Sequence, residues 1–365
     1  MIFEEINTEP IEHLLLAVVT AGATDLLLAV DSPPRMRVDG RLNVIPGESV
    51  LSDEDLSKTI LAMLPEKARD ELFVDKEHDF SFTYQTTHRF RGNCFVTQGA
   101  LALALRSIPL AIPTPEELRL PPVLSSVCEL PQGFVLVTGP TGSGKSTTLA
   151  SMIDYINQRH PLHILTIEDP IEYVHKHKVA AVNQREVGLD TNSFPRALRS
   201  ALREDPDVIL VGEMRDPETI QFALTLAETG HLVFATLHTN DAAQALDRIS
   251  DVFPPERQTQ IKVQLAASVA AVVSQRLIPK INGGLVAAFE VLLANMAVRN
   301  LIREGRSHQL RNIMHGGKNE GMLTLEASLN GLVEEGIISY DEALSRSMHD
   351  KEIKKPLSLA RAAGT

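Results

Sequence analysis

The sequence predicts an α/β protein of two domains, with a parallel β-sheet in the second domain. Three observations predict this class. The chain has 365 residues, which is enough for two domains with apolar cores of their own. From about residue 123, apolar strand-like runs alternate with helix-like stretches, a pattern typical of a parallel sheet. A glycine-rich segment, Gly-Pro-Thr-Gly-Ser-Gly-Lys-Ser, lies between the apolar run 134–137 and the helix-like stretch 147–156.

The first 105 residues are predicted to form a small α/β domain. An apolar segment at 14–19 predicts an amphipathic helix rather than a signal peptide, because glutamates and neither lysine nor arginine precede it. Ser52 and Asp55 form a capping-box pattern at the start of a helix that runs through Leu61. The predicted strands, with one hairpin that turns at Asp39-Gly40, are 26–30, 36–44, 80–84, 90–96 and 101–105.

A linker and a larger second domain follow. Residues 106–122 are predicted to be an ordered, extended linker and hinge, because the stretch 109–122 contains five prolines. Residues 123–365 are predicted to form the second domain, which becomes mostly helical after Asp241 and has a helical C-terminal region from about 295. The predicted strands of this domain are 134–138, 163–167, 208–212, 232–236, and two near 276–278 and 285–291.

Composition excludes several classes of function. Hydrophobic residues make up 44% and charged residues 22% of the chain, an ordinary balance for a globular protein. The net charge of −12 disfavours nucleic acid as a partner. Two cysteines without a CxxC pair exclude a cysteine-built zinc site and fit a reducing compartment. No apolar run approaches 18 residues, so we expect no direct membrane insertion and any membrane attachment to come through a partner.

The glycine-rich segment predicts a phosphate-binding P-loop. Its glycines let backbone N–H groups approach phosphate oxygens, and the following helix adds partial positive charge at its first turn. Lys145 is suited to reach the β- and γ-phosphates, and the Ser146 hydroxyl is suited to bind Mg²⁺. ATP and Mg²⁺ are therefore the expected ligands. The predicted nucleotide-binding residues are Gly139, Pro140, Thr141, Gly142, Ser143, Gly144, Lys145, Ser146 and Thr147.

Two acidic strand ends are candidates to complete this site, because ligands bind at the carboxyl ends of parallel strands. Glu213 follows the run 208–212 and is the candidate for polarising the attacking water. Glu168, Asp169 and Glu172 follow the run 163–167, and three carboxylates this close repel one another unless a cation neutralises them. A solvated loop is the alternative for this cluster. Gly212 stands where a Walker B aspartate is expected, so Glu168 and Asp169 join Ser146 as candidate Mg²⁺ ligands.

Histidines and arginines supply the remaining candidates. His231 and His238 bracket the run 232–236, where they could sense the γ-phosphate or pass its loss to a neighbouring subunit; a structural hydrogen bond is the alternative for either. Arginines that reach a triphosphate from another domain or subunit stabilise developing charge, although a surface ion pair is the default for any single one. The candidates are Arg89, Arg91 and Arg106 in the first domain and Arg196, Arg199 and Arg203 in the second.

These motifs together resemble the secretion ATPases of the type II and type IV pilus class. The resemblance covers nearly the whole chain and rests on GPTGSGKST, ITIEDPIEYVH, ALREDPDVILVGEMRD and GHLVFATLHTN. It implies a PAS-like N-terminal α/β domain joined to a RecA-like P-loop ATPase domain, and a ring of six copies. The catalytic residues that it implies are Glu213, Glu172, Glu168, Asp169, His231, His238, Arg91 and Arg106.

Within the class, two features resemble the pilus retraction (twitching motility) ATPases. The chain runs past Gln275-Arg276-Leu277 without the tetracysteine insertion of export ATPases, and Met296–Glu304 is similar to a C-terminal signature of the retraction members. The resemblance implies a platform protein of the inner membrane as partner, at its cytoplasmic face, with other pilus ATPases as further candidates. The alternatives are a pilus extension or type II secretion ATPase, a low-turnover regulatory ring subunit and, disfavoured by the net charge, a DNA motor.

Overall fold

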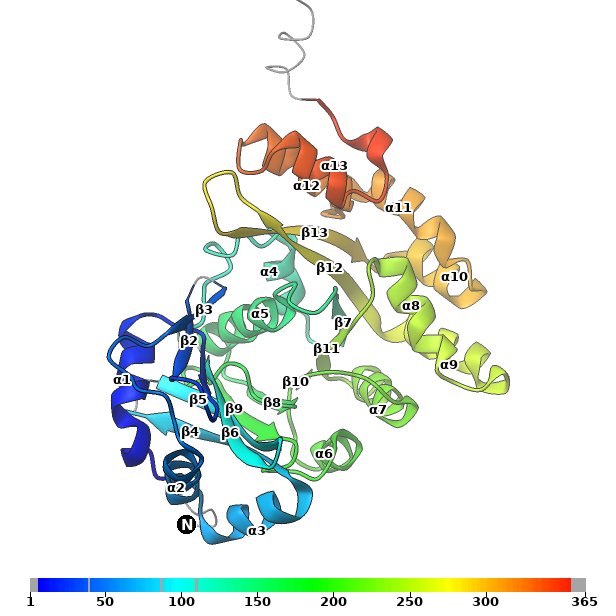
Figure 1. Ribbon diagram of the computed structural model, residues 1–365. Helices are drawn as coiled ribbons and strands as arrows, with labels where there is room; N and C mark the ends of the chain where they lie inside the picture. The colour runs from blue at the N-terminus through cyan, green and yellow to red at the C-terminus, as the bar shows by residue number, and fades with distance from the viewer. Residues whose placement is uncertain (1–5, 39, 86–87, 109–110, 356–365) are drawn as a thin grey trace, which may run out of the picture. The chain divides into compact units, whose positions relative to one another are not determined.

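The computed structural model describes residues 6–38, 40–85, 88–108 and 111–355 (Figure 1). The chain divides into two compact units, Met1–Ala111 and Ile112–Thr365. Both units combine helices with a β-sheet, so the predicted α/β class is confirmed. Asp39, at the predicted hairpin turn, and Pro109, in the predicted linker, lie outside the described residues.

The first unit is built on a six-stranded antiparallel sheet in the order β3-β2-β1-β6-β5-β4. The hairpin predicted over 36–44 is confirmed as β2 and β3. Strand β6 includes the first three residues of the predicted linker, because it pairs with β5 as far as Ile108. The strands are β1 (Asp25–Leu28), β2 (Arg35–Val38), β3 (Arg41–Val44), β4 (Glu77–Tyr84), β5 (His88–Thr97) and β6 (Ala100–Ile108).

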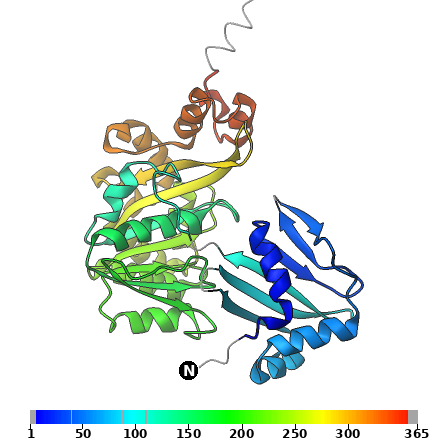
Figure 2. The ribbon, with the colours of Figure 1, turned by 90° about the vertical axis from the view of Figure 1, so that its left-hand side faces the viewer.

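Helices cover one face of this sheet, and α1 lies across it in Figure 2. The helical segments are η1 (Glu9–Ile11), α1 (Glu12–Thr20), α2 (Asp53–Met63) and α3 (Glu66–Asp75). The predicted cap of α2 is confirmed, since the Ser52 hydroxyl oxygen accepts a hydrogen bond from the Asp55 N–H at 3.1 Å. Alternate strand residues such as Phe90 and Leu105 are buried against the helices. The opposite sheet face is therefore the one that carries polar side chains.

The second unit contains a seven-stranded sheet in the order β13-β12-β7-β11-β10-β8-β9. The six strands from β12 to β9 are parallel, and β13 is antiparallel to β12. The strands are β7 (Gly133–Thr138), β8 (His163–Glu168), β9 (Ala181–Glu186), β10 (Val208–Val211), β11 (Leu232–Leu237), β12 (Val269–Pro279) and β13 (Leu285–Leu293). Parallel pairing brings the carboxyl ends of β7, β11, β10 and β8 to one edge of the sheet.

Helices cover both faces of this sheet (Figure 1). Along β7, Phe134 and Leu136 enter one apolar core, with residues of α6 to α10, while Val135 and Val137 enter the other, with α4 and α5. The helices are α4 (Val123–Cys128), α5 (Lys145–Arg159), α6 (Phe194–Ala201), α7 (Pro217–Glu228), α8 (Ala242–Asp251), α9 (Pro255–Ser268) and α10 (Met296–Glu304). The double coverage explains why these strands are continuous apolar runs.

The C-terminal part of the unit is helical, as predicted. It packs against the far ends of β12 and β13 through a separate apolar cluster that includes Ile278, Leu329 and Ile338. The segments after α10 are η2 (Ser307–Gln309), α11 (Leu310–Gly316), η3 (Gly317–Glu320), α12 (Leu325–Glu334), α13 (Tyr340–Arg346) and η4 (Asp350–Glu352). In Figure 1, α12 and α13 lie over the β12–β13 pair.

Candidate active site

The glycine-rich segment forms a tight loop between β7 and α5. Strand β7 ends at Thr138 and α5 begins at Lys145, with Gly139 and Gly144 at φ +149° and +86°. A Cβ on Gly139 would lie 2.4 Å from the Gln275 backbone oxygen, and one on Gly144 would lie 2.8 Å from the Gln275 side-chain nitrogen. The backbone angles favour glycine at both positions, and at Gly139 the backbone oxygen of Gln275 also leaves no space for a side chain.

Lys145 is mostly buried beside this loop. Its Nζ donates to the backbone oxygens of Gly139 at 2.8 Å and Pro140 at 3.2 Å, and lies 3.5 Å from His238 Nδ1. Burial lowers the pKa of the Lys145 ammonium, and the charges of Glu213 and Glu172 oppose that shift. The cation is thus held between the loop carbonyls and the residues that follow the neighbouring strands.

Glu213 joins this group from the end of β10. Its Oε1 lies 3.3 Å from His238 Nε2, and its Oε2 accepts a hydrogen bond from Arg215 at 2.7 Å. The Arg215 hydrogen bond is the main reason that the pKa of Glu213 is lowered, so the carboxylate is the form present at neutral pH. Lys145, His238, Glu213 and Arg215 form a continuous polar chain along the carboxyl edge of three adjacent strands.

The glycine at the Walker B position has a packing reason. A Cβ on Gly212 would lie 3.2 Å from both the Glu168 Cα and the Ile167 backbone oxygen. The Gly212 N–H also donates to Ile167 O at 2.8 Å. Strands β10 and β8 therefore approach too closely at this point for an aspartate to fit easily.

The acidic residues after β8 differ from one another in their surroundings. The Glu168 carboxylate accepts hydrogen bonds from the Thr166 hydroxyl at 2.6 Å and the Gln184 amide at 3.2 Å, and burial raises its pKa. Asp169 and Glu172 are exposed. The hydrogen bond and charge of Glu213 are the main causes that raise the pKa of Arg215, and the charge of Asp169 adds to them. The charge of Glu172 opposes the lowering of the Lys145 pKa by burial, so both carboxylates act electrostatically on the polar chain.

These oxygen donors are of the kind that Mg²⁺ prefers, and Ser146 adds a hydroxyl in the first turn of α5. Within the described ranges, no group of three or more His, Cys, Asp or Glu side chains is arranged to hold a metal ion. A site of this kind fits Mg²⁺ that arrives with phosphate oxygens as additional ligands, because Mg²⁺ is usually bound by only one or two protein carboxylates.

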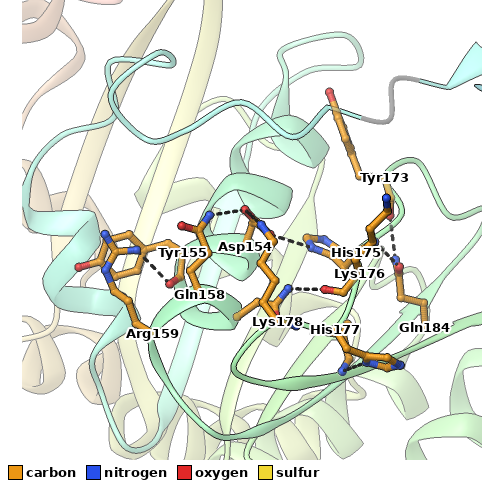
Figure 3. Close-up of polar contacts among 12 residues, drawn as sticks. Asp154, Tyr155, Gln158, Arg159, Tyr173, His175, Lys176, His177, Lys178 and Gln184 are labelled. Carbon is orange, nitrogen blue, oxygen red and sulfur yellow. Dashed lines mark hydrogen bonds and ion pairs between the residues drawn. The ribbon is translucent and has the colours of Figure 1, made fainter. Parts of the chain in front are cut away.

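The loop between β8 and β9 is tied to α5, as Figure 3 shows. The Asp154 carboxylate accepts from Lys178 Nζ at 2.7 and 2.8 Å, and His175 Nδ1 lies 3.9 Å away. Burial would raise the pKa of Asp154, but its contacts with His175, Lys178 and Gln158 outweigh burial and lower it. Sequence reasoning missed this contact, because Lys178 and His175 each lie more than twenty residues from Asp154 in the sequence.

A second contact ties the same loop to the first turn of α5. The Tyr173 hydroxyl and the Thr147 hydroxyl are hydrogen-bonded at 2.9 Å. Thr147 was predicted to bind nucleotide and Tyr173 follows the acidic cluster directly, so this bond connects two motifs that are separate in the sequence. This bond therefore helps to fix the position of the acidic cluster relative to the first turn of α5.

His231 is not part of this cluster. It precedes β11, at the amino edge of the sheet, where its Nδ1 lies 2.9 Å from Leu226 O and 3.3 Å from the Thr229 hydroxyl. The six residues of β11 separate it from His238 by roughly 20 Å. Within this chain the ring of His231 makes the structural hydrogen bond that was given as its alternative. A role for either histidine in sensing the γ-phosphate, or in passing its loss to a neighbouring subunit, stays a prediction.

The predicted arginines of the second unit and Arg106 are exposed, whereas Arg91 and Arg89 are half-buried, and Arg89 donates a hydrogen bond to the Ser81 hydroxyl at 2.9 Å. Arg91 and Arg106 are register partners on β5 and β6, on the sheet face away from the helices. Arg106 Nε lies 2.9 Å from Asp25 Oδ1, and Arg91 lies 3.9 Å from Asp79. In the second unit Arg199 pairs with an exposed glutamate, Arg196 is also exposed, and Arg203 follows the end of α6. Contact of Arg91 and Arg106 with a triphosphate stays a prediction.

Two residues of the site were not predicted. Arg215 pairs with Glu213, and its place two residues later in GEMRD was a usable signal. Gln275 contacts the P-loop from β12, and no local signal could have found it because 132 residues separate it from Ser143.

Comparison with known proteins places the whole arrangement in a family. Residues 114–341 match the model of the family described as type II/IV secretion system protein. The chain is 49% identical to the type IV pilus retractation ATPase PilT of Pseudomonas aeruginosa, over 92% of this chain and 98% of that protein. It is 48% identical to a twitching motility protein of Neisseria gonorrhoeae, over 88% of this chain and 86% of that protein.

A solved structure agrees with these relatives. The crystal structure of the pilus retraction motor PilT with bound ADP superposes with a TM-score of 0.88 at 47% identity, covering 94% of this chain and 98% of that one. In the part of the chain that the structure describes, we find no helix with both the length and the apolar character that a bilayer crossing requires.

Proposed function

The chain belongs to the family of type II/IV secretion system proteins, and from this premise we propose that it is an ATPase that drives type IV pilus retraction. One observation carries the proposal. Lys145, His238 and Glu213 form one continuous polar cluster beside a loop whose glycines at 139 and 144 have backbone angles that side chains rarely adopt. The likeness to a retraction motor that binds ADP supports both the ligand and the kind of work.

The roles follow from the contacts. Backbone N–H groups at the start of α5 would bind phosphate oxygens, and Lys145 would exchange its bonds to Gly139 and Pro140 for bonds to the β- and γ-phosphates. Glu213, kept ionised by Arg215, would orient and polarise the attacking water. His238 touches both Lys145 and Glu213, so it is suited to sense whether a γ-phosphate separates them.

The metal belongs to the same proposal. Bound Mg²⁺ neutralises charge on the β- and γ-phosphates. Ser146, Glu168 and Asp169 are the residues of this chain that would hold it. The Thr166 and Gln184 hydrogen bonds fix the Glu168 carboxylate in place.

The assembly is proposed from the family. A homo-hexamer, working at the cytoplasmic face of the inner membrane on a platform protein, fits a motor of this class, and other pilus ATPases are further candidate partners. The part of the predicted linker that follows the end of β6 at Ile108 would serve as its hinge. Arg91 and Arg106 would supply positive charge to a triphosphate. Their exposure on one sheet face supports this, since only Asp25 and Asp79 contact them among the described ion pairs.

The activity is tested with Lys145→Ala. We expect the purified chain to release phosphate from Mg²⁺-ATP and to bind ADP, and the variant to lose turnover at least 100-fold because the cation that binds the transferred phosphate is gone. Melting temperature in the absence of nucleotide is the control for folding. Equal phosphate release by the variant would refute the ATPase site.

The direction of work needs a cell. Deleting the gene for this chain should give cells with excess pili that do not move on surfaces, because pili that form are not withdrawn. Cells without pili would instead support an extension or secretion ATPase. Normal pili with no ATPase activity of the pure protein would support a regulatory subunit.

A further inference from the structure

Gln275 makes an unusual set of contacts with the P-loop. Its side chain is buried, with the residue only 3% exposed, and it extends from β12 beneath the loop. The Gln275 Oε1 accepts a hydrogen bond from the Thr148 hydroxyl at 2.7 Å, and its Nε2 donates to the Ser143 backbone oxygen at 2.7 Å. One amide thus bridges a residue before and a residue after the segment 144–147, which contains Lys145.

The bond to Ser143 has a consequence for the next peptide. In a trans peptide, the C=O and the N–H of the following residue point in opposite directions. Because the Ser143 carbonyl points to the Gln275 amide, the Gly144 N–H points away from that amide and does not compete for it, so it stays available to a bound anion. The bond to Thr148 fixes the first turn of α5 against the same amide.

The backbone of β12 adds to this support. Ser274 is the register partner of Thr138 on β7, and the side-chain hydroxyls of these two residues are hydrogen-bonded at 2.8 Å. The Gln275 backbone oxygen occupies the space that a side chain on Gly139 would need. A loop with three glycines at positive φ has many alternative conformations, so its binding shape depends on neighbours that select one.

We propose that Gln275 is a positioning residue that holds the P-loop in the conformation that binds nucleotide phosphates. The inference rests on the proposed function, because it assigns the residue that prepares the same site. Gln275 does not touch the phosphates. It acts through the orientation of the Gly144 peptide and through the first turn of α5, and its amide is suited to this because it both accepts and donates a hydrogen bond.

The test uses variants without a new charge near the phosphates. Gln275→Met keeps the length of the side chain and removes both hydrogen bonds, and Thr148→Val removes one of them. A matched control exists at Gln264, whose amide also bridges two groups, Gln221 and Glu228, both 3.1 Å away and at the other edge of the sheet. Gln264→Met therefore removes the same kind of contacts away from the P-loop.

The measurement is the Kd for N-methylanthraniloyl-ADP by fluorescence titration of the full chain, with melting temperature recorded without nucleotide. We expect Gln275→Met to raise Kd at least tenfold and Thr148→Val about threefold, with Thr148→Ser close to the unmodified chain. Gln264→Met should bind within twofold. The double variant Gln275→Met/Thr148→Val should bind no worse than Gln275→Met, because the Thr148 hydroxyl has already lost its acceptor.

Each outcome decides the question. Normal ADP affinity in Gln275→Met, or in Thr148→Val should the first variant not fold, overturns the positioning role. An equal loss in Gln264→Met overturns it too, because the effect would then be general destabilisation. If the unmodified chain binds no ADP, the proposed function fails and this inference fails with it, whereas normal binding by Gln275→Met removes the inference alone.

Discussion

The two edges of the seven-stranded sheet carry histidines from the same short segment, in very different surroundings. At the carboxyl edge, His238 lies between the Lys145 ammonium and the Glu213 carboxylate. At the amino edge, His231 contacts only Leu226 O and the Thr229 hydroxyl among the described hydrogen bonds of its ring. Strand direction produces the difference, since parallel strands place all of their following residues at one edge.

The two histidines show that a single sequence motif can contain residues with different roles. GHLVFATLHTN looks like one functional unit in the sequence, yet a six-residue strand runs through it. Its first histidine helps to close the turn between α7 and β11, and its second joins the charged cluster. We therefore expect residues at the carboxyl edge to act in ATP hydrolysis and residues at the amino edge to stabilise the fold. The following variants test this edge rule.

The largest effect is expected for Glu213→Gln. The amide keeps the size of the side chain but cannot accept a proton or polarise water as a carboxylate does, so kcat for phosphate release should fall at least 100-fold. The matched control at the amino edge is Glu228→Gln, which alters a glutamate at the end of α7 and should stay within twofold. Phosphate release at saturating Mg²⁺-ATP measures both. The contrast between the edges breaks down if Glu213→Gln keeps more than a third of the activity.

The histidines give a smaller and more direct contrast. We expect His238→Ala to lower kcat about tenfold, because one contact between Lys145 and Glu213 is lost while both charges remain. His231→Ala should keep turnover within twofold and lower the free energy of unfolding by about 1 kcal/mol, the usual value of one hydrogen bond. Steady-state kinetics and denaturant unfolding of both variants provide the measurement. A stronger kinetic effect in His231→Ala would assign it a role between subunits, against the edge rule.

The sequence predicted the carboxyl edge better than any other part. Glycine spacing, the acidic strand ends and the apolar runs are local signals, and the P-loop, β8, β10 and β11 appear where they indicated. Strand β12 was predicted only near 276–278, although it begins at Val269. The buried apolar residues directly after α9 have the same pattern as a continuation of that helix. Only the pairing of this segment with β7 makes it a strand.

Contacts between distant segments account for what was missed. Gln275 meets Ser143 and Thr148 only because β12 lies next to β7. Helix α3 and strand β9 have weak patterns of their own and take their form from packing against neighbours. Strand β11 places His231 and His238 at opposite edges of the sheet, and the rule that ligands bind at the carboxyl ends of parallel strands was a usable signal to separate them.

The smallest effect is expected at Glu290, which lies at the carboxyl edge but outside the cluster. It is the register partner of Ser274, and its Oε1 accepts from the Ala242 N–H at 2.8 Å at the start of α8. Burial raises the pKa of Glu290 to about 7; the Ala242 hydrogen bond and Arg311 oppose that shift, and Asp241 and Glu326 add to it.

The sign of the pH effect follows from this pKa. Between about pH 4.5 and 7 the folded chain keeps a proton on Glu290 that the unfolded chain has lost, so the free energy of unfolding falls as pH rises through this window. The full loss is at most about 3 kcal/mol. Glu290→Gln does not titrate and keeps the acceptor for Ala242, so its melting temperature should exceed that of the unmodified chain by a few degrees at pH 8 and match it at pH 5. Its kcat should change less than twofold. Equal melting temperatures at both pH values would mean that Glu290 is not held protonated, and a large loss of kcat would extend the catalytic cluster across the edge to β13.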